Sequence, residues 1–151
     1  MMVGRTANKH FAAGIDDYAE RIGHYMPFTL TVIPELKNTK KLSEEQQKQA
    51  EGELILKLLQ PQDTVVLLDE HGQELRSVEL ARWLERKQTT ARRLVFVIGG
   101  PYGFSPEVYA RANEQLSLSR LTFSHQMVRL VFTEQIYRAC TIIKGEPYHH
   151  E

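Results

Sequence analysis

Three glycines that follow a short apolar run are the residues in this chain whose spacing first indicates chemistry. The run is Leu94–Ile98, LVFVI, and the glycines are Gly99, Gly100 and Gly103. Glycine has no Cβ, so backbone amides and carbonyls there can approach a ligand closely. Ser105 and Pro106 have the residue types that begin a helix. A buried strand, a glycine turn and a helix predict a ligand site at the carboxyl edge of a parallel sheet.

Two common nucleotide-binding patterns do not fit this turn. A dinucleotide fingerprint needs G-x-G-x-x-G after the first strand, but Gly100 and Gly103 supply only its second half and follow a late strand. The acidic residue expected about 20 positions later is also missing. The Gly-Lys-Ser/Thr ending of a phosphate loop does not occur in the chain. The turn therefore predicts a ligand other than NAD.

Nucleophilic and metal chemistry have weaker support. Cys140 lies among apolar helix residues, which favours a small core side chain over a nucleophile. No serine stands in a nucleophile elbow. His149, His150 and Glu151 could bind a metal, but adjacent histidines in a polar tail do not define a site. We expect no metal.

Composition indicates a soluble, single-domain protein, residues 1–151. Hydrophobic residues make up 42% and charged residues 25% of the 151. We see no secretory signal and no apolar run of about 20 residues, and the one cysteine excludes an intrachain disulfide, so we expect a cytoplasmic protein. The zero net charge argues against non-specific coating of nucleic acid. Two basic clusters, 37–41 and 82–93, are interpreted as solvated surface.

Helical and strand patterns alternate along the chain and predict an α/β fold with a mostly parallel sheet. Helices are expected at 9–25, 44–59, 77–87, from Pro106, and at 126–144, and strands at 28–33, 64–68, 94–98 and, weakly, 116–119. Ser77 is expected to cap the third helix. Residues 1–3 are too short to form a convincing strand on their own.

The last predicted helix has apolar residues on two sides. Beyond its broad core face, Met127, Leu130 and Tyr137 stand among charged residues. A second apolar strip indicates a second packing partner, which we interpret as another subunit. A few partly exposed apolar residues remain the alternative.

Three ordered blocks carry a family resemblance. They are VIGGPYGFSP at 97–106, LSLSRLTFSHQMVRLVFTEQIYRA at 116–139 and GEPYHHE at 145–151. Together they resemble the RlmH family of SPOUT methyltransferases. TVVLLDEHG at 64–72 is similar to the family's first pocket loop, and VGRT at 3–6 to the end of its first strand. Family members begin with a full strand before this segment, and most of that strand is expected to be missing here.

The resemblance implies methylation of N3 of a pseudouridine in large-subunit (23S) ribosomal RNA, with S-adenosylmethionine as methyl donor. It also implies a C-terminal trefoil knot, a feature that periodicity does not predict. The donor would lie between three loops. Their residues are Leu68, Gly99, Gly103, Leu118, Ser119, Arg120, Leu121, Thr122 and Phe123. Glycines would admit backbone contacts, and the apolar side chains would form a wall.

Methyl transfer to a nitrogen requires alignment of the reacting atoms and removal of the N3 proton. The candidate catalytic residues are His125, Arg129, Tyr148 and His149. Our hypothesis is that Arg129 contacts RNA phosphate or the base, whereas His125 could equally serve in helix capping or packing. We expect a homodimer that acts on assembled ribosomes, because a small neutral domain offers little surface for RNA. The alternative is a non-catalytic ribosome- or RNA-binding factor with the same fold.

Overall fold

The computed structural model describes residues 1–151 and consists of one five-stranded parallel sheet with helices on both faces. The strands are β1 (Met2–Val3), β2 (Val32–Ile33), β3 (Thr64–Glu74), β4 (Leu94–Ile98) and β5 (Glu114–Ser117). The helices are α1 (Lys9–Gly23), α2 (Glu44–Leu58), α3 (Ser77–Thr90), α4 (Pro106–Arg111) and α5 (Met127–Ile143), with a 3-10 turn, η1 (Thr39–Lys41). The predicted α/β class is confirmed.

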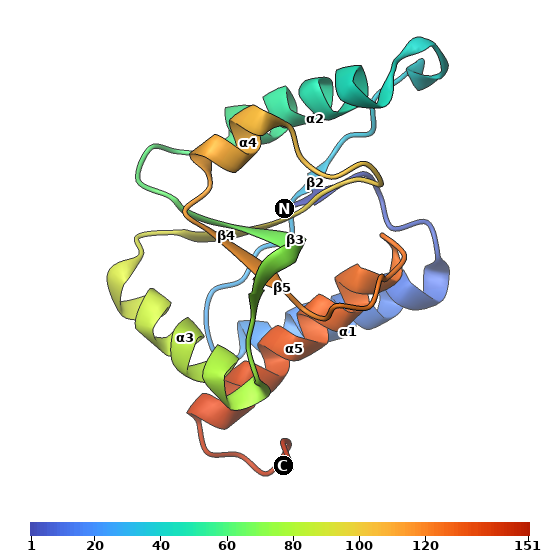
Figure 1. The fold of residues 1–151 in the computed structure, drawn as a ribbon. Coiled ribbons are helices and arrows are strands. Elements are labelled where there is room, and N and C mark those ends of the chain that lie inside the picture. The colour runs from blue at the N-terminus through green and yellow to red at the C-terminus, as the bar shows by residue number, and fades with distance from the viewer.

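The sheet order is β2-β1-β4-β3-β5, and every pair is parallel. Helices α2 and α4 cover one face, whereas α1, α3 and α5 cover the other (Figure 1). Each face has its own apolar cluster. Ile22, Leu84 and Ile136 lie in the cluster under α1, α3 and α5, and Ile55 and Val108 lie in the one under α2 and α4. Strands buried on both faces explain the nearly continuous apolar runs in β3 and β4.

Local capping signals determine where several helices begin. The Ser43 hydroxyl accepts from the Gln46 amide and the Gln46 side chain accepts from the Ser43 amide, which forms a capping box at the start of α2. Ser105 caps α4, and Pro106 occupies its first turn. The expected Ser77 cap is wrong: Arg76 is the N-cap residue, and its amide donates to Glu79 at 2.7 Å.

The predicted strand at 28–33 is much shorter than expected. Only Val32 and Ile33 pair with β1, and residues 27–31 belong to no strand, although the Thr31 carbonyl accepts from the Met2 amide. A strand requires a neighbour for its backbone groups, and β1 itself has only two residues. In contrast, β3 continues to Glu74 because it pairs again with β5 beyond a bulge.

The second apolar strip of α5 is covered by α1 of the same chain. Leu130 lies directly against Gly14, where a Cβ would come within 2.7 Å of it. The Tyr137 ring packs against the rings of Tyr18 and Tyr25, at centroid distances of 5.7 and 6.2 Å. Leu130 and Tyr137 thus have a partner within the chain, so this strip does not by itself indicate a subunit interface. None of the helices is both long and apolar enough to span a membrane.

Candidate active site at the carboxyl edge of the sheet

Strand register brings the three predicted loops together. Leu68 pairs with Ile98 of β4 on one side and with Leu116 of β5 on the other. Gly99 follows Ile98 directly, and Leu118 comes two residues after Leu116. Because parallel strands end at the same edge of a sheet, the loops that follow these three strands lie side by side. Leu68 and Leu118 are both half-buried against the core.

The first loop protrudes from β3 as a bulge. Leu116 pairs with both Leu68 and Gln73, so residues 69–72 project from the ladder. A Cβ on Gly72 would lie 2.7 Å from backbone atoms of Gln115 and Leu116, which only glycine avoids. The sequence LDEHG thus folds back closely over β5.

Asp69 holds this loop to α4. One oxygen of its side chain accepts a short hydrogen bond from the Tyr109 hydroxyl, and the other accepts from the His71 amide at 2.9 Å. Burial and the bond to Asp69 raise the pKa of Tyr109, so its phenol remains a donor at neutral pH. Tyr109 also packs edge-on against Phe104, which follows the glycine turn. Tyr109 therefore links two of the three loops.

The glycine turn has the backbone that its sequence predicts. Gly103 has φ +81° and donates to the Gly100 carbonyl at 3.3 Å. A residue with a Cβ is strained at this φ. Behind the turn lies Glu51 of α2, which is only 6% exposed and accepts from Gln47 at 3.3 Å. Burial raises the pKa of the Glu51 carboxyl.

Serine hydroxyls shape the third loop. Ser117 donates to the Ser119 carbonyl at 3.0 Å, and the Ser119 hydroxyl accepts from the Leu121 amide at 3.0 Å. Arg120 lies 3.7 Å from Glu74 and is exposed. Thr122 is exposed, Phe123 is half-buried, and Leu121 is 76% exposed, the largest value among the big apolar residues.

The chain then crosses the sheet edge from β5 to β1. The Gln126 side chain accepts from the Ala7 amide at 2.8 Å and donates to the Arg5 carbonyl at 3.3 Å. Because β3 and β4 lie between β5 and β1 in the sheet, residues 118–126 span the carboxyl ends of both.

Arg129 is buried and bound to the backbone, which corrects our hypothesis of an RNA contact. Its guanidinium is aimed at the end of β1 and donates to the carbonyls of Val3 at 2.6 Å and Gly4 at 2.9 Å, and to the Thr6 hydroxyl at 3.0 Å. The residue is 1% exposed. A guanidinium enclosed in this way positions the β1 end and the start of α5 and does not face a phosphate.

His125 lies beside the third loop on an exposed turn, with neither ring nitrogen hydrogen-bonded. The N-cap residue of α5 is Gln126, which makes no side-chain capping bond, and the Ser124 hydroxyl accepts from the Met127 amide at 3.1 Å. The capping alternative for His125 is therefore wrong, and its imidazole is free to meet a substrate.

The C-terminal tail folds back along α5. The Tyr148 hydroxyl donates to Glu134 at 3.0 Å, and the Arg138 guanidinium lies 4.8 Å from the centre of the Tyr148 ring. Arg138 also donates to Glu134 at 2.6 Å and lies 3.2 Å from His149 Nδ1. A guanidinium only donates, so Nδ1 is the acceptor and the proton of His149 lies on Nε2, which has no partner.

Within a single chain, the four predicted catalytic residues do not all lie close to one another. Tyr148 is anchored at Glu134, seven residues into α5 and about 10 Å along its axis from Met127. His125 precedes that helix, and the tail donates no hydrogen bond to it. His125 borders the three loops, whereas Tyr148 and His149 form a separate cluster.

Sequence reasoning missed several residues that hold the site. Asp69 and Tyr109 stand 40 positions apart, and no local pattern links them. Glu134 and Arg138 have a helical i, i+4 spacing that predicts an ion pair but gives no hint of the tail that they bind.

The fold and this edge site agree with the comparison to known proteins. A family model described as predicted SPOUT methyltransferase matches residues 1–149. The chain belongs to the SPOUT methyltransferase family. It is similar to proteins named ribosomal RNA large subunit methyltransferase H, at 63% identity in Phocaeicola vulgatus, 62% in Bacteroides fragilis and 61% in Bacteroides thetaiotaomicron. Each match covers 100% of this chain and 97% of the relative.

Proposed function

We propose that this protein is a cytoplasmic, S-adenosylmethionine-dependent methyltransferase that acts at N3 of a pseudouridine in 23S ribosomal RNA. The observation that carries the proposal is the register of Leu68 with Ile98 and Leu116, which puts three loops at one sheet edge. Relatives at 61–63% identity that bear the name of a large-subunit rRNA methyltransferase support the substrate class.

The residues at this edge fit the methyl donor. The glycine turn offers backbone groups, and at Gly103 a Cβ would meet nothing within 4 Å, so the turn is open on that side. Half-buried Leu68 and Leu118 offer apolar surface for an adenosine, and the 119–123 loop would close over it. When bound, S-adenosylmethionine supplies an electrophilic methyl group. The crossing of residues 118–126 supports the trefoil knot as part of the proposal.

Within the proposal, His125 has the role of proton acceptor for N3–H. It is the exposed imidazole next to the third loop, and a histidine titrates in the required pH range. Arg129 donates hydrogen bonds to the carbonyls of Val3 and Gly4 and so fixes the start of α5, which His125 precedes. Arg129 is therefore a positioning residue. His149 Nε2 is buried without a hydrogen-bond partner, 3.9 Å from Glu151, so it would donate to a base carbonyl only after the tail has moved.

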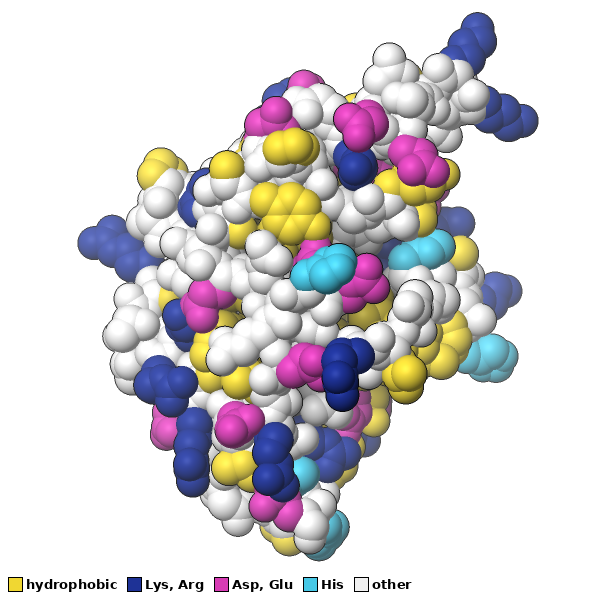
Figure 2. Space-filling view, viewed as in Figure 1, with side chains coloured by type: hydrophobic (Ala, Val, Ile, Leu, Met, Phe, Trp, Pro, Cys, Tyr) yellow, Lys and Arg dark blue, Asp and Glu magenta, His cyan; other side chains and the backbone are white.

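The proposal includes a homodimer and an assembled ribosome as substrate. The exposed Leu121 at the loop rim supports a dimer, because a second copy could cover it and bring a tail cluster to a neighbouring His125. Most of the basic side chains near α3 are exposed (Figure 2), but Lys87 pairs with Glu114 and Arg93 with Asp63. Because the net charge of the chain is zero, ribosomal contacts would supply the rest of the binding.

Labelled methyl transfer to ribosomes that lack the modification tests this function. We expect transfer to assembled 50S or 70S particles to exceed transfer to purified rRNA by at least about 10-fold, with the label at pseudouridine N3. Equal activity on both would contradict the ribosome part of the proposal. Calorimetry without detectable binding of S-adenosylmethionine would favour the non-catalytic factor instead. Sedimentation of the protein and of Leu121→Asp tests the dimer, and a wild-type monomer would contradict it.

A further inference from the structure

Three lysines stand on a short projection that precedes α2. They are Lys37, Lys40 and Lys41, and all three side chains are exposed. We call residues 37–41, which include η1, the lysine turn. Figure 1 shows this turn at the outer end of α2, and in Figure 2 dark blue side chains extend into solvent at the same place. Charge alone indicates solvated surface here, but the position of the turn in the fold indicates more.

The lysine turn begins at the same sheet edge as the proposed active site. It follows β2, which ends level with β1, because the Gly4 amide donates to the Ile33 carbonyl at 2.7 Å. In the sheet order, β2 lies two strand spacings from β4, about 10 Å. Lys37 is four residues beyond Ile33 and therefore lies within about 14 Å of the end of β2. The lysines thus flank the loops of the proposed site.

The backbone of the lysine turn is ordered at both ends. Asn38 has φ 60°, a left-handed conformation that asparagine accepts more readily than most residues. The Leu42 amide donates to the Thr39 carbonyl at 3.0 Å, which closes the 3-10 turn. Ser43 then begins α2 with its capping box. The three amines are therefore carried by a defined turn between β2 and α2.

The carboxylates near the lysine turn have other partners. Glu35 packs against Gly4, where a Cβ would lie 2.8 Å from its side chain, and the Arg129 guanidinium binds the carbonyl of the same glycine. Glu44 and Glu45 occupy the first turn of α2, where the helix dipole favours negative charge. All ion pairs of the protein lie elsewhere, so the three lysines are free to bind an anion.

Two more basic residues continue this positive surface along the edge of the sheet. Arg5 and Lys9 follow β1, are exposed and form no ion pair. The Arg5 carbonyl accepts from the Gln126 side chain at 3.3 Å, and Gln126 is the neighbour of His125. Positive charge is therefore present from the lysine turn to the start of α5.

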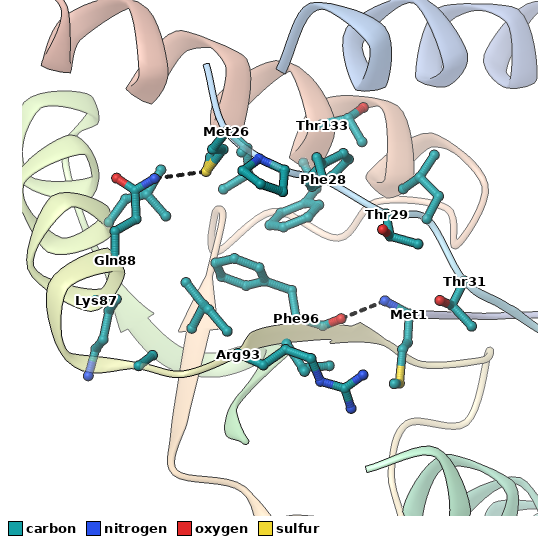
Figure 3. A pocket seen from close by; sticks show the side chains of 18 of the residues that line it. Met1, Met26, Phe28, Thr29, Thr31, Lys87, Gln88, Arg93, Phe96 and Thr133 are labelled. Atoms are coloured by element: carbon teal, nitrogen blue, oxygen red, sulfur yellow. Dashed lines mark hydrogen bonds between the residues drawn. The ribbon is translucent and has the colours of Figure 1, made fainter. Parts of the chain in front are cut away.

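The largest cavity of the protein lies at the opposite edge of the sheet and does not offer such a surface. Its volume is about 560 Å³, and residues 26–31 and 91–96 form its walls (Figure 3). Of its 21 lining residues 13 are hydrophobic, which does not suit phosphate. Lys87 and Arg93, which border it, are paired with Glu114 and Asp63. The edge with the proposed site is therefore the better place for an RNA backbone.

We propose that the lysine turn binds the phosphate backbone of the RNA strand that enters the site, an inference that rests on the proposed function for the identity of the RNA. Lysine ammonium groups are compact charges that suit phosphate, and such contacts position a nucleic acid without reading its sequence. Because the turn stands to the side of the glycine turn, it holds nucleotides that flank the target base and leaves the loops of the site open. A chain with zero net charge thereby concentrates positive charge where its substrate binds.

Removal of the three charges tests the proposal. The test variant is Lys37→Gln/Lys40→Gln/Lys41→Gln. The matched control, Arg82→Gln/Arg86→Gln/Arg92→Gln, loses three exposed cations from α3 and from the segment before β4. Because all six side chains are exposed, both variants should keep the Tm of the parent.

Fluorescence anisotropy with a single-stranded oligouridine of about 12 nucleotides measures RNA binding between about 50 and about 200 mM salt. We expect the slope of log K against log salt to be smaller by about 2 in the lysine variant, since each phosphate contact on a single strand contributes about 0.7. The control should keep the slope of the parent.

Steady-state methyl transfer to 50S particles provides a second readout. We expect the lysine variant to raise KM for the particles about 5-fold or more. Its kcat and its Kd for S-adenosylmethionine should not change, because the three lysines lie outside the loops of the site.

Three outcomes would overturn the proposal. An unchanged salt slope together with an unchanged KM would show that the lysines do not contact RNA, even though methyl transfer is intact. Equal losses in the arginine control would show a general effect of charge. Loss of binding to vesicles of anionic phospholipid, with oligouridine binding retained, would assign the turn to a membrane surface. In contrast, a parent protein that transfers no methyl group but shows lysine-dependent RNA binding would reject the proposed function and support the phosphate contact.

Discussion

The Arg129 guanidinium donates a 2.6 Å hydrogen bond to the Val3 carbonyl, although the two residues are 126 positions apart in the chain. Two further bonds, to Gly4 and Thr6, fix the same side chain. The start of α5 and the end of β1 are thus held by one buried cation. Since the loop that precedes α5 borders the proposed active site, this contact links the stability of the sheet to the site.

Replacement of Arg129 by Met should destabilise the protein by about 2–4 kcal/mol. The change removes three donors and leaves the carbonyls of Val3 and Gly4 without their buried partner. Urea denaturation measures the free energy of unfolding. The exposed Arg92→Met is the control and should stay within about 0.5 kcal/mol of the parent. A similar small effect for Arg129→Met would contradict the positioning role.

Removal of the Tyr109 hydroxyl should weaken binding of S-adenosylmethionine. Tyr109→Phe leaves an Asp69 oxygen without its donor and frees the 69–72 loop beside Leu68. We expect Kd to rise about 5- to 20-fold, the effect of about 1–2 kcal/mol on a positioned loop. Calorimetry measures this value. Tyr102→Phe is the matched control, because Tyr102 lies on the glycine turn with its side chain exposed. Equal Kd values for both variants would exclude Asp69–Tyr109 as a support of the site.

Glu51 should make stability depend on pH. Burial raises the pKa of its carboxyl, so the unfolded chain ionises at lower pH than the folded protein. Stability is therefore lost as pH rises from the unfolded value, about 4.3, through the higher folded value. Glu51→Gln should be more stable than the parent at pH 7, by about 1 kcal/mol, and equal to it below about pH 4.

Thermal or urea unfolding at pH 4 and pH 7 measures this difference. The exposed Glu53→Gln serves as the control and should shift neither curve. If the stability difference between Glu51→Gln and the parent is the same at pH 4 and at pH 7, the Glu51 carboxyl carries no buried charge.

His125→Ala should reduce methyl transfer without affecting the fold. The imidazole is exposed and makes no hydrogen bond, so its loss should leave Tm unchanged. Loss of a proton acceptor should lower kcat about 100-fold or more, and raised pH should restore part of the rate. His10→Ala provides an exposed histidine control on α1. Near-normal kcat for His125→Ala would remove it from the proton transfer and leave His149 as the candidate to replace next.

Elements with strong local signals were predictable from the sequence. The β4 strand, the glycine turn and the Ser105 cap of α4 follow one another as expected, because glycine, serine and proline act on the backbone within a few residues. In the strand predicted at 28–33, residues 28–31 do not form a strand, for the opposite reason. Its residues have β-forming types, but strand pairing depends on a partner that the fold does not place there.

The sequence by itself determined the class of fold, the order of its elements and the family, since long ordered blocks and periodic apolar residues are local properties of the chain. Only the tertiary structure decided what Arg129, Leu130 and Tyr137 do. Each was assigned to an external partner, either RNA or a second subunit. The position of a residue in the sequence indicates that it has a partner but does not identify that partner. Contacts with Val3 and with α1 come from segments more than 100 positions away. Packing of distant segments, which no local spacing encodes, gave all three a partner within the chain.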